Sequence, residues 1–177
     1  MRIAVSGKSG CGNTTVSGML ARHYGLKLIN YTFHDIAREK GMPFDLFYEK
    51  EVVGRTDYYW DGYLDNKLLE FSKEDNTVLA SRLAIWLSDN ADLKIYLYAK
   101  IEVRAERIIN REGGIYSDIL SATFSRDFND SKRYLSLYNV DIDNYSCVAD
   151  LIVDSTDKSA SRVFELIRGE IEKRGLI

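Results

Sequence analysis

The N-terminal segment combines a short apolar run, a glycine-rich turn and an amphipathic stretch. The run RIAVS at residues 2–6 predicts a buried strand, and apolar residues at helical spacing between Thr14 and Tyr24 predict a helix that ends at Gly25. A glycine-rich turn between a strand and a helix aims backbone N–H groups and the positive end of the helix dipole at one point in space. The segment therefore predicts a parallel α/β fold with a phosphate-binding loop at residues 7–15.

Strand and helix patterns alternate along the rest of the chain. Short apolar runs predict four further strands, and amphipathic stretches predict the helices that separate them. The four runs are LKLIN at 26–30, NTVLAS at 76–81, LKIYLYA at 93–99 and ADLIVDST at 149–156. Strands that alternate with helices form a parallel sheet covered on both faces. We therefore expect a single three-layer α/β domain, residues 1–177, built around a five-stranded parallel sheet.

Charge and hydropathy exclude several classes of protein. A formal net charge of -3 at pH 7 argues against a protein that coats nucleic acid or an anionic membrane through a positive field. No apolar run approaches the roughly 18 residues that a membrane span needs, and no signal-peptide pattern precedes RIAVSG. We expect a cytoplasmic protein, a monomer or weak homodimer, that binds neither nucleic acid nor membrane.

The loop at residues 7–15 departs from the usual phosphate-binding motif at one position. Gly7, Gly12 and Thr14 stand where G-x-x-x-x-G-K-[ST] needs them, but Asn13 replaces the lysine that reaches the β- and γ-phosphates. An amide can form hydrogen bonds but carries no charge. The alternative is a glycine-rich turn that binds nothing. We expect the whole loop to bind the phosphates of a nucleotide, through Gly7, Lys8, Ser9, Gly10, Cys11, Gly12, Asn13, Thr14 and Thr15.

Two side chains of this loop have candidate roles in catalysis. Thr14 would offer its hydroxyl to a Mg²⁺ ion that bridges the β- and γ-phosphates. Lys8 stands where P-loop proteins that resemble the partition ATPases place an additional functional lysine. Lys8 could return the missing charge, within its own site or a neighbour's, or it could point to solvent. We take Lys8 as a candidate catalytic residue and Thr14 as the candidate metal ligand.

Four later segments carry a resemblance to a known family. LASRLAIWL, ADLKIYLYAKIEVRAERIINREGG, SRDFNDSKRYLSLYNVDIDNYS and ADLIVDST resemble the second half of the short cytidylate kinases of archaeal type, in the nucleoside monophosphate kinase group. The resemblance implies a P-loop fold with a helical monophosphate-binding insertion at 31–75 and a mobile lid at 111–140. It also implies transfer of the γ-phosphoryl group of ATP to CMP or dCMP with Mg²⁺.

The resemblance assigns roles to several side chains. It implies lid-type catalytic roles for Arg126 and Arg133, although SRDFNDSKRY would also suit a solvated helix face with paired charges. SRLAIW resembles the family's GRLAGW, whose arginine would hold the monophosphate, so Arg82 is a candidate substrate ligand. Asp61 and Asp65 could serve the sugar or base of CMP, with Asp65 the chosen candidate, or they could simply face water.

Three departures from the family pattern fall at positions that handle phosphate. They are Asn13, Ala80, where an acidic residue is expected, and His34, which stands near a family arginine and is a candidate ligand for the acceptor phosphate. Arg104 and Arg107 could either bind phosphate or merely lie on a helix that covers the sheet. The departures predict a weak kinase, and they leave two alternatives: a nucleotide-binding sensor or regulator without turnover, and a kinase for another small metabolite.

Overall fold

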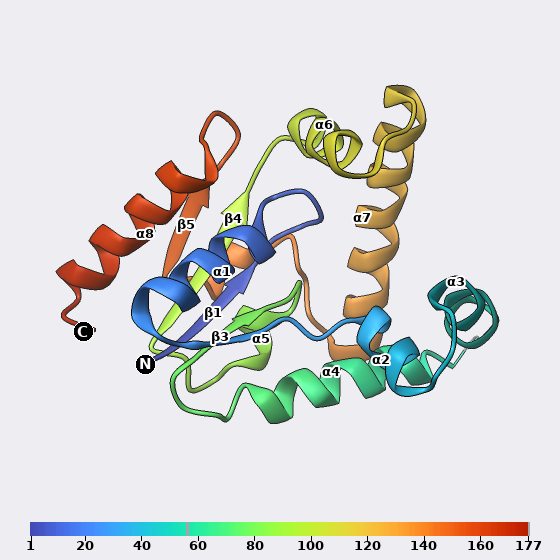
Figure 1. Cartoon of the computed structure of the whole chain (residues 1–177), viewed down its shortest axis with the longest axis horizontal. Coiled ribbons are helices and arrows are strands. Elements are labelled where there is room, and N and C mark those ends of the chain that lie inside the picture. The colour runs from blue at the N-terminus through green and yellow to red at the C-terminus, as the bar shows by residue number, and fades with distance from the viewer. Residues whose placement is uncertain (56, 177) are drawn as a thin grey trace.

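A central sheet of five parallel strands organises the computed structural model, which describes residues 1–55 and 57–176 (Figure 1). The strands lie in the order β2-β3-β1-β4-β5, and every neighbouring pair is parallel. Their bounds are β1 Arg2–Ser6, β2 Lys27–Ile29, β3 Thr77–Ala80, β4 Leu93–Tyr98 and β5 Leu151–Asp154. The predicted α/β class and the five-stranded parallel sheet are confirmed.

Helices α1 (Asn13–Tyr24) and α8 (Ala160–Lys173) cover one face of the sheet (Figure 1). Alternate strand residues face them, because successive side chains of a strand point to opposite faces. Ile3 and Val5 of β1 lie in this core, together with Val16 of α1 and Ile167 of α8, all at most 1% exposed. The buried residues of α8 recur at helical spacing, at Val163, Phe164, Ile167 and Ile171, so one side of the helix faces the sheet.

The opposite face of the sheet packs against α4 (Tyr59–Phe71) and the short α5 (Ala84–Leu87). Ala4 and Tyr96 turn toward this side and meet Leu68 of α4 and Ile85 of α5 in a second buried cluster. Ser6, the last residue of β1, accepts a hydrogen bond from the backbone N–H of Ile85 (3.1 Å). Helices on both faces confirm the predicted three-layer arrangement.

A compact group of helices lies between β2 and β3, in the segment where the insertion at 31–75 is expected. It consists of α2 (Phe33–Glu39), α3 (Phe44–Phe47), a π-helix (Tyr48–Val53) and α4. Ile36, Phe47 and Trp60 form its own small core. The role of this group in binding a monophosphate remains a prediction.

Helices α6 (Ile101–Glu112) and α7 (Tyr116–Tyr138) pack against each other at the carboxyl edge of the sheet. They are joined through Gly113 and Gly114, whose φ angles of 78° and 111° suit glycine. α7 stands apart from the sheet (Figure 1), and its C-terminal part is held where Tyr134 packs with Leu83 and Ile142. A 3₁₀ turn at Tyr145–Cys147 leads into β5. No helix within the described residues is long and apolar enough to cross a membrane.

Candidate active site

The loop between β1 and α1 needs glycine at three positions. Gly10 and Gly12 have φ angles of 85° and 102°, a backbone conformation that side chains disfavour. A Cβ atom on Gly7 would lie 2.5 Å from the carbonyl oxygen of Leu97 on β4. The glycines therefore allow the chain to turn tightly against the sheet before α1 begins.

Asn13 braces this loop instead of supplying charge to it. Its Nδ2 group donates a hydrogen bond of 2.6 Å to the carbonyl oxygen of Gly7, which closes the loop on itself. Its Oδ1 atom is buried and has no hydrogen-bond partner among the described residues. Because an amide is neutral, the phosphate-binding cation must come from another side chain.

Two arginines of α6 hold the loop from the other side. Arg104 is 4% exposed and donates to the carbonyl oxygens of Ser9 (3.2 Å) and Ala99 (3.2 Å). It also forms a bidentate pair with Asp127 of α7, at 2.5 and 3.1 Å. From the sequence, Arg104 could either bind phosphate or lie on a helix that covers the sheet. Nothing in the sequence pattern marked Asp127 as its partner. In the structure this largely buried ion pair connects the loop to α7.

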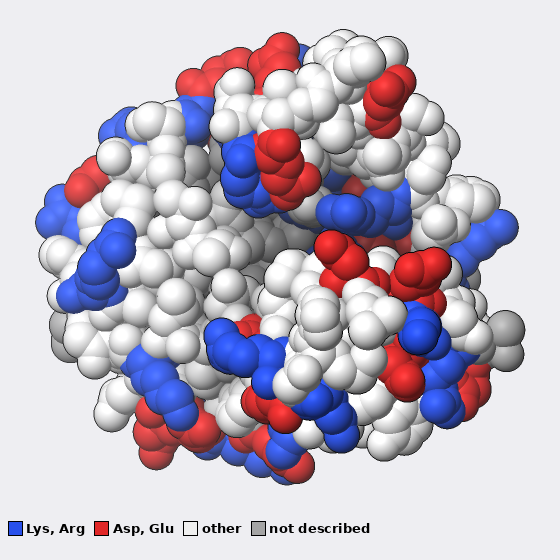
Figure 2. Space-filling view, turned by 45° about the vertical axis from the view of Figure 1, so that its right-hand side comes forward, with Lys and Arg blue, Asp and Glu red and all other residues white. Residues whose placement is uncertain are grey.

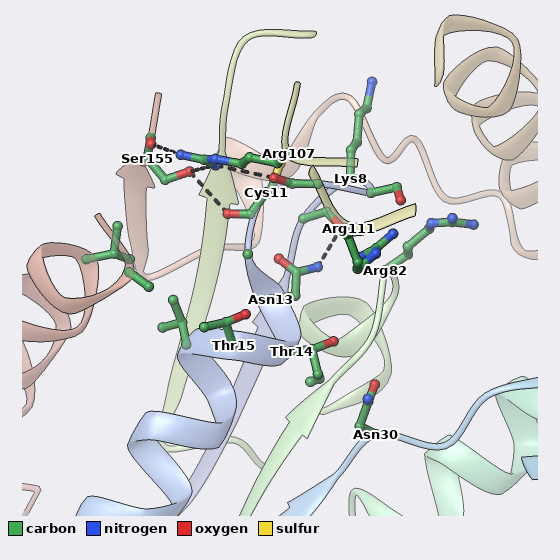
Figure 3. A pocket seen from close by; sticks show the side chains of 18 of the residues that line it. Lys8, Cys11, Asn13, Thr14, Thr15, Asn30, Arg82, Arg107, Arg111 and Ser155 are labelled. Atoms are coloured by element: carbon green, nitrogen blue, oxygen red, sulfur yellow. Dashed lines mark hydrogen bonds between the residues drawn. The ribbon is translucent and has the colours of Figure 1, made fainter. Parts of the chain in front are cut away.

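Arg107 connects the same loop to the segment after β5. Its guanidinium donates to the carbonyl oxygens of Gly10 (3.3 Å) and Ser155 (2.6 Å), and the Ser155 hydroxyl donates in turn to the carbonyl of Cys11 (3.1 Å) (Figure 3). Burial raises the pKa of the Cys11 thiol, and the nearby Arg104 charge lowers it by less. The resulting pKa is about 11, so this cysteine stays protonated and unreactive near neutral pH.

A cavity of about 620 Å³, here called the donor cavity, opens in front of the loop. All nine predicted loop residues line it, and the hydroxyl-bearing Thr14 and Thr15 project from the start of α1 (Figure 3). Arg107, Arg111 and Lys158 line it as well. Figure 2 shows a hollow across the middle of the molecule with Lys, Arg and acidic side chains at its rim. The donor cavity has the basic and hydroxyl groups that a polyphosphate requires.

A smaller cavity of about 220 Å³, here called the acceptor cavity, lies beside the donor cavity. Side chains from α4, α7 and the end of β3 line it, including Asp61, Asp65, Arg82, Arg133 and Tyr134. The two cavities share part of their walls. The five shared residues are Asn30, Thr32, Ala80, Ser81 and Arg82.

Ion pairs fix the two arginines of the acceptor cavity. Asp130 of α7 lies 2.6 Å from Arg82 and 3.0 Å from Arg133, so one carboxylate holds both cations. Asp61 of α4 lies 2.9 Å from Arg133. The alternative of a solvated helix face for SRDFNDSKRY therefore does not hold at Asp130, which is 6% exposed. The charge pattern correctly predicted ion pairs within the helix, such as Arg133 with Asp130. It did not predict the pairs with other elements, which are Asp130 with Arg82 and Arg133 with Asp61.

Asp65 is also buried, at 8% exposed, so the alternative that Asp61 and Asp65 face water is wrong for both. The hydroxyl of Tyr138 donates a 2.7 Å hydrogen bond to Asp65 Oδ2. Burial raises the pKa of Asp65 to about 6, and the Tyr138 hydrogen bond and the Arg133 charge oppose this rise only in part. Periodicity alone could not find these contacts because they join α4 to the far end of α7.

The remaining predicted site residues take different positions. Lys8 forms an ion pair with Asp143 at 2.6 Å, and the exposed Arg126 donates a long hydrogen bond of 3.4 Å to the hydroxyl of Ser9. His34 lies on an exposed face of α2, stacked on Phe44 with ring centroids 3.5 Å apart, and lines neither the donor nor the acceptor cavity. Of the residues predicted to bind the acceptor, Arg82 and Asp65 line the acceptor cavity and His34 does not.

Comparison with known proteins agrees with this arrangement. Residues 3–121 match the model of a family described as an AAA domain. The chain is 69% identical over 176 residues to "Cytidylate kinase 2" of Borreliella afzelii, covering 99% of both chains. It is 39% identical over 172 residues to "Cytidylate kinase" of Pyrococcus horikoshii, covering 96% of this chain and 88% of that one. Among solved structures, shikimate kinase from Acinetobacter baumannii superposes with a TM-score of 0.67 at 20% identity, covering 99% and 95% of the two chains.

The chain has a P-loop kinase fold. This class is defined by the parallel sheet, the glycine-rich loop before α1 and the two adjoining cavities. Within that class, the chain belongs to the cytidylate kinase family. Its enzyme class is that of the nucleoside monophosphate kinases. The resemblance stated from the sequence is thereby confirmed at the level of the family.

Proposed function

We propose that the protein transfers the γ-phosphoryl group of ATP to CMP or dCMP, with Mg²⁺. The observation that carries this proposal is the shared wall between the donor and acceptor cavities, with Arg82 in it. Phosphoryl transfer needs two polyanions in line and positive charge at the point where they meet. The names of the curated relatives support CMP as the acceptor.

In this proposal the acceptor cavity separates phosphate recognition from nucleoside recognition. Arg82 and Arg133 bind the monophosphate, because guanidinium groups match phosphate oxygens in pairs. Asp61 and Asp65 offer carboxyl groups to the sugar or to the amino group of the base. The acceptor competes with Asp130 for both arginines, since each already pairs with that carboxylate at 3.0 Å or less.

In the donor cavity the loop binds the β- and γ-phosphates through backbone N–H groups at the start of α1. The hydrogen bond from Arg126 to the hydroxyl of Ser9 supports a role for this arginine in binding the transferred phosphoryl group. We assign Lys8 the role of the missing loop lysine, since its four-carbon stem lets the ammonium group change position. Loss of such a cation typically reduces the rate by orders of magnitude.

The donor cavity also fits a magnesium ion. Mg²⁺ prefers oxygen ligands, keeps several waters and is often held by only one or two protein groups together with phosphate oxygens. The Thr14 hydroxyl lines the cavity, and so does the hydroxyl of Ser81, a buried oxygen with no partner among the described residues. Ala80 offers no carboxylate, so Thr14 would hold the ion and Ser81 could accept or donate a hydrogen bond to one of its waters. When bound, the ion would supply positive charge that neutralises the phosphates.

A coupled assay of ADP release tests this proposal. Wild type, Arg82→Ala and the control Arg168→Ala are compared with ATP, Mg²⁺ and each of CMP, dCMP, UMP, AMP and shikimate. Among the described residues, Arg168 pairs only with Glu165 and Glu172 on the surface of α8, so its loss should leave turnover unchanged. We expect turnover with CMP and dCMP and a fall of about a hundredfold or more for Arg82→Ala. ATP binding without turnover on any acceptor would instead favour a regulatory nucleotide-binding protein.

A further inference from the structure

Lys8 lies on the wall between the donor cavity and a second cavity of about 540 Å³. Its ammonium group is 2.6 Å from Asp143 and 3.9 Å from Asp127. Both carboxylates line the second cavity, and neither lines the donor cavity. Figure 3 shows the Lys8 side chain pointing away from Asn13 and Thr14. In this conformation the ammonium group lies next to the two carboxylates of the second cavity.

Asp143 is the main partner of Lys8 in this position. Asp127 is already paired with both terminal nitrogens of Arg104, at 2.5 and 3.1 Å, so its charge is largely satisfied. Asp143 offers Oδ1 to Lys8 and Oδ2 to the hydroxyl of Ser131, 3.0 Å away on α7. The carboxylate therefore joins the phosphate-binding loop to the predicted lid helix.

The Lys8–Asp143 pair can exchange partners because it is partly exposed. The side chain of Asp143 is 54% exposed and that of Lys8 is 25% exposed. Pairs of this kind contribute little free energy, whereas the phosphates of ATP present several negative charges. A lysine has a flexible stem, so its ammonium group can turn from the carboxylate to the phosphates without a change in the backbone.

Building on the proposed function, we propose that Asp143 is a positioning residue that holds Lys8 outside the donor cavity until Mg-ATP draws the ammonium group across. Ser131 of α7 orients the carboxylate of Asp143. The strength of the Lys8–Asp143 pair therefore depends on the position of α7. The binding of Mg-ATP must then break the Lys8–Asp143 pair, and that cost lowers the affinity for Mg-ATP. Removing the negative charge of Asp143 removes the cost, but only while Lys8 is present.

A double-mutant cycle measures this coupling directly. The dissociation constant of Mg-ATP without acceptor is determined by calorimetry for wild type, Asp143→Asn, Lys8→Ala and the double variant. We expect Asp143→Asn to tighten binding about two- to fivefold in the presence of Lys8 and to have no effect in the Lys8→Ala background. Asp143→Glu, which keeps the charge, should bind like wild type. Asp89→Asn, a change at an exposed carboxylate that lines none of these three cavities, controls for net charge.

Two results would overturn the inference: weaker or unchanged binding in Asp143→Asn, or an equal change with and without Lys8. If Asp143→Asn does not show a cooperative thermal transition, Ser131→Ala takes its place in the cycle, with a smaller shift in the same direction expected. A different result would overturn the proposed function itself: wild type that neither binds Mg-ATP nor turns over with CMP. Wild-type turnover together with an uncoupled cycle would remove only the role of Asp143.

Discussion

Replacement of Asp65 by asparagine should stabilise the protein near neutral pH. Asp65 is 8% exposed, and burial raises the pKa of its carboxyl group from 3.8 to about 6. Asparagine has nearly the same shape, carries no charge and keeps an oxygen that can accept the hydrogen bond from Tyr138. The variant therefore removes the cost of burying a charge and retains the contact that joins α4 to α7.

The sign and size of the effect follow from proton linkage. Below about pH 3 the carboxyl group is protonated in both the folded and the unfolded state, so it adds no penalty. Between about pH 4 and pH 6 the unfolded state ionises first, and the stability of the wild type falls as the pH rises. Above pH 6 the full penalty remains, about 3 kcal/mol for a pKa that rises from 3.8 to about 6. Asp65→Asn should gain up to that amount at about pH 7.5 and only about 0.5 kcal/mol near pH 4.

Urea unfolding followed by tryptophan fluorescence measures the difference. Wild type and Asp65→Asn are compared at about pH 7.5, 6 and 4.5, with Asp45→Asn, a change at an exposed carboxylate on α3, as the control. The advantage of Asp65→Asn should shrink steadily as the pH falls, while the control stays flat. A variant that is less stable at pH 7.5, or whose advantage does not change with pH, would refute the assignment of a raised pKa to Asp65.

Three further substitutions test the loop, its brace and the acceptor cavity. Gly10→Ala places a Cβ atom 2.8 Å from the carbonyl oxygen of Arg104 at a φ of 85°, so it should lower the free energy of unfolding by about 1–3 kcal/mol and weaken Mg-ATP binding. Asp127→Asn leaves the charge of Arg104 buried and unpaired, and chemical denaturation should show a loss of about 3–5 kcal/mol. Arg82→Lys loses the planar fork that meets Asp130 and phosphate, so the KM for CMP should rise about tenfold in steady-state kinetics.

Each of these expectations can fail on its own. Unchanged Mg-ATP affinity in Gly10→Ala would show that the loop does not bind phosphate in this conformation. Unchanged stability in Asp127→Asn would mean that the Arg104 pair is not a brace. An unchanged KM for CMP in Arg82→Lys, whatever happens to kcat, would remove Arg82 from the binding of the acceptor.

The local parts of the fold could be predicted from the sequence, and the long-range contacts could not. The run RIAVS and the glycine turn after it specify β1 and the loop, because strand periodicity and the conformational freedom of glycine act over a few residues. The pairing of Arg104 with Asp127, in contrast, joins residues 23 positions apart on two helices. Nothing in the local pattern distinguishes such a buried pair from charges that face water.

The same limit explains the errors in the acceptor cavity. Asp61 and Asp65 have the spacing of a solvated helix face, yet α7 covers them and supplies Arg133 and Tyr138 as partners. His34 was chosen by its place in a family pattern, but the side chain stacks on Phe44 instead of entering a cavity. Residue type and spacing find candidate groups, and only the packing of distant elements decides which of them share a site.

The most direct test of the central claim follows the phosphoryl group itself. Wild-type protein is incubated with Mg²⁺, CMP and ATP labelled with ³²P in the γ-phosphate, and the products are separated by chromatography. If the donor and acceptor cavities work as one site, the label appears in CDP in proportion to the ADP formed, and none appears without CMP. Label found only in ATP, or only in free phosphate, would contradict phosphoryl transfer to a pyrimidine nucleoside monophosphate.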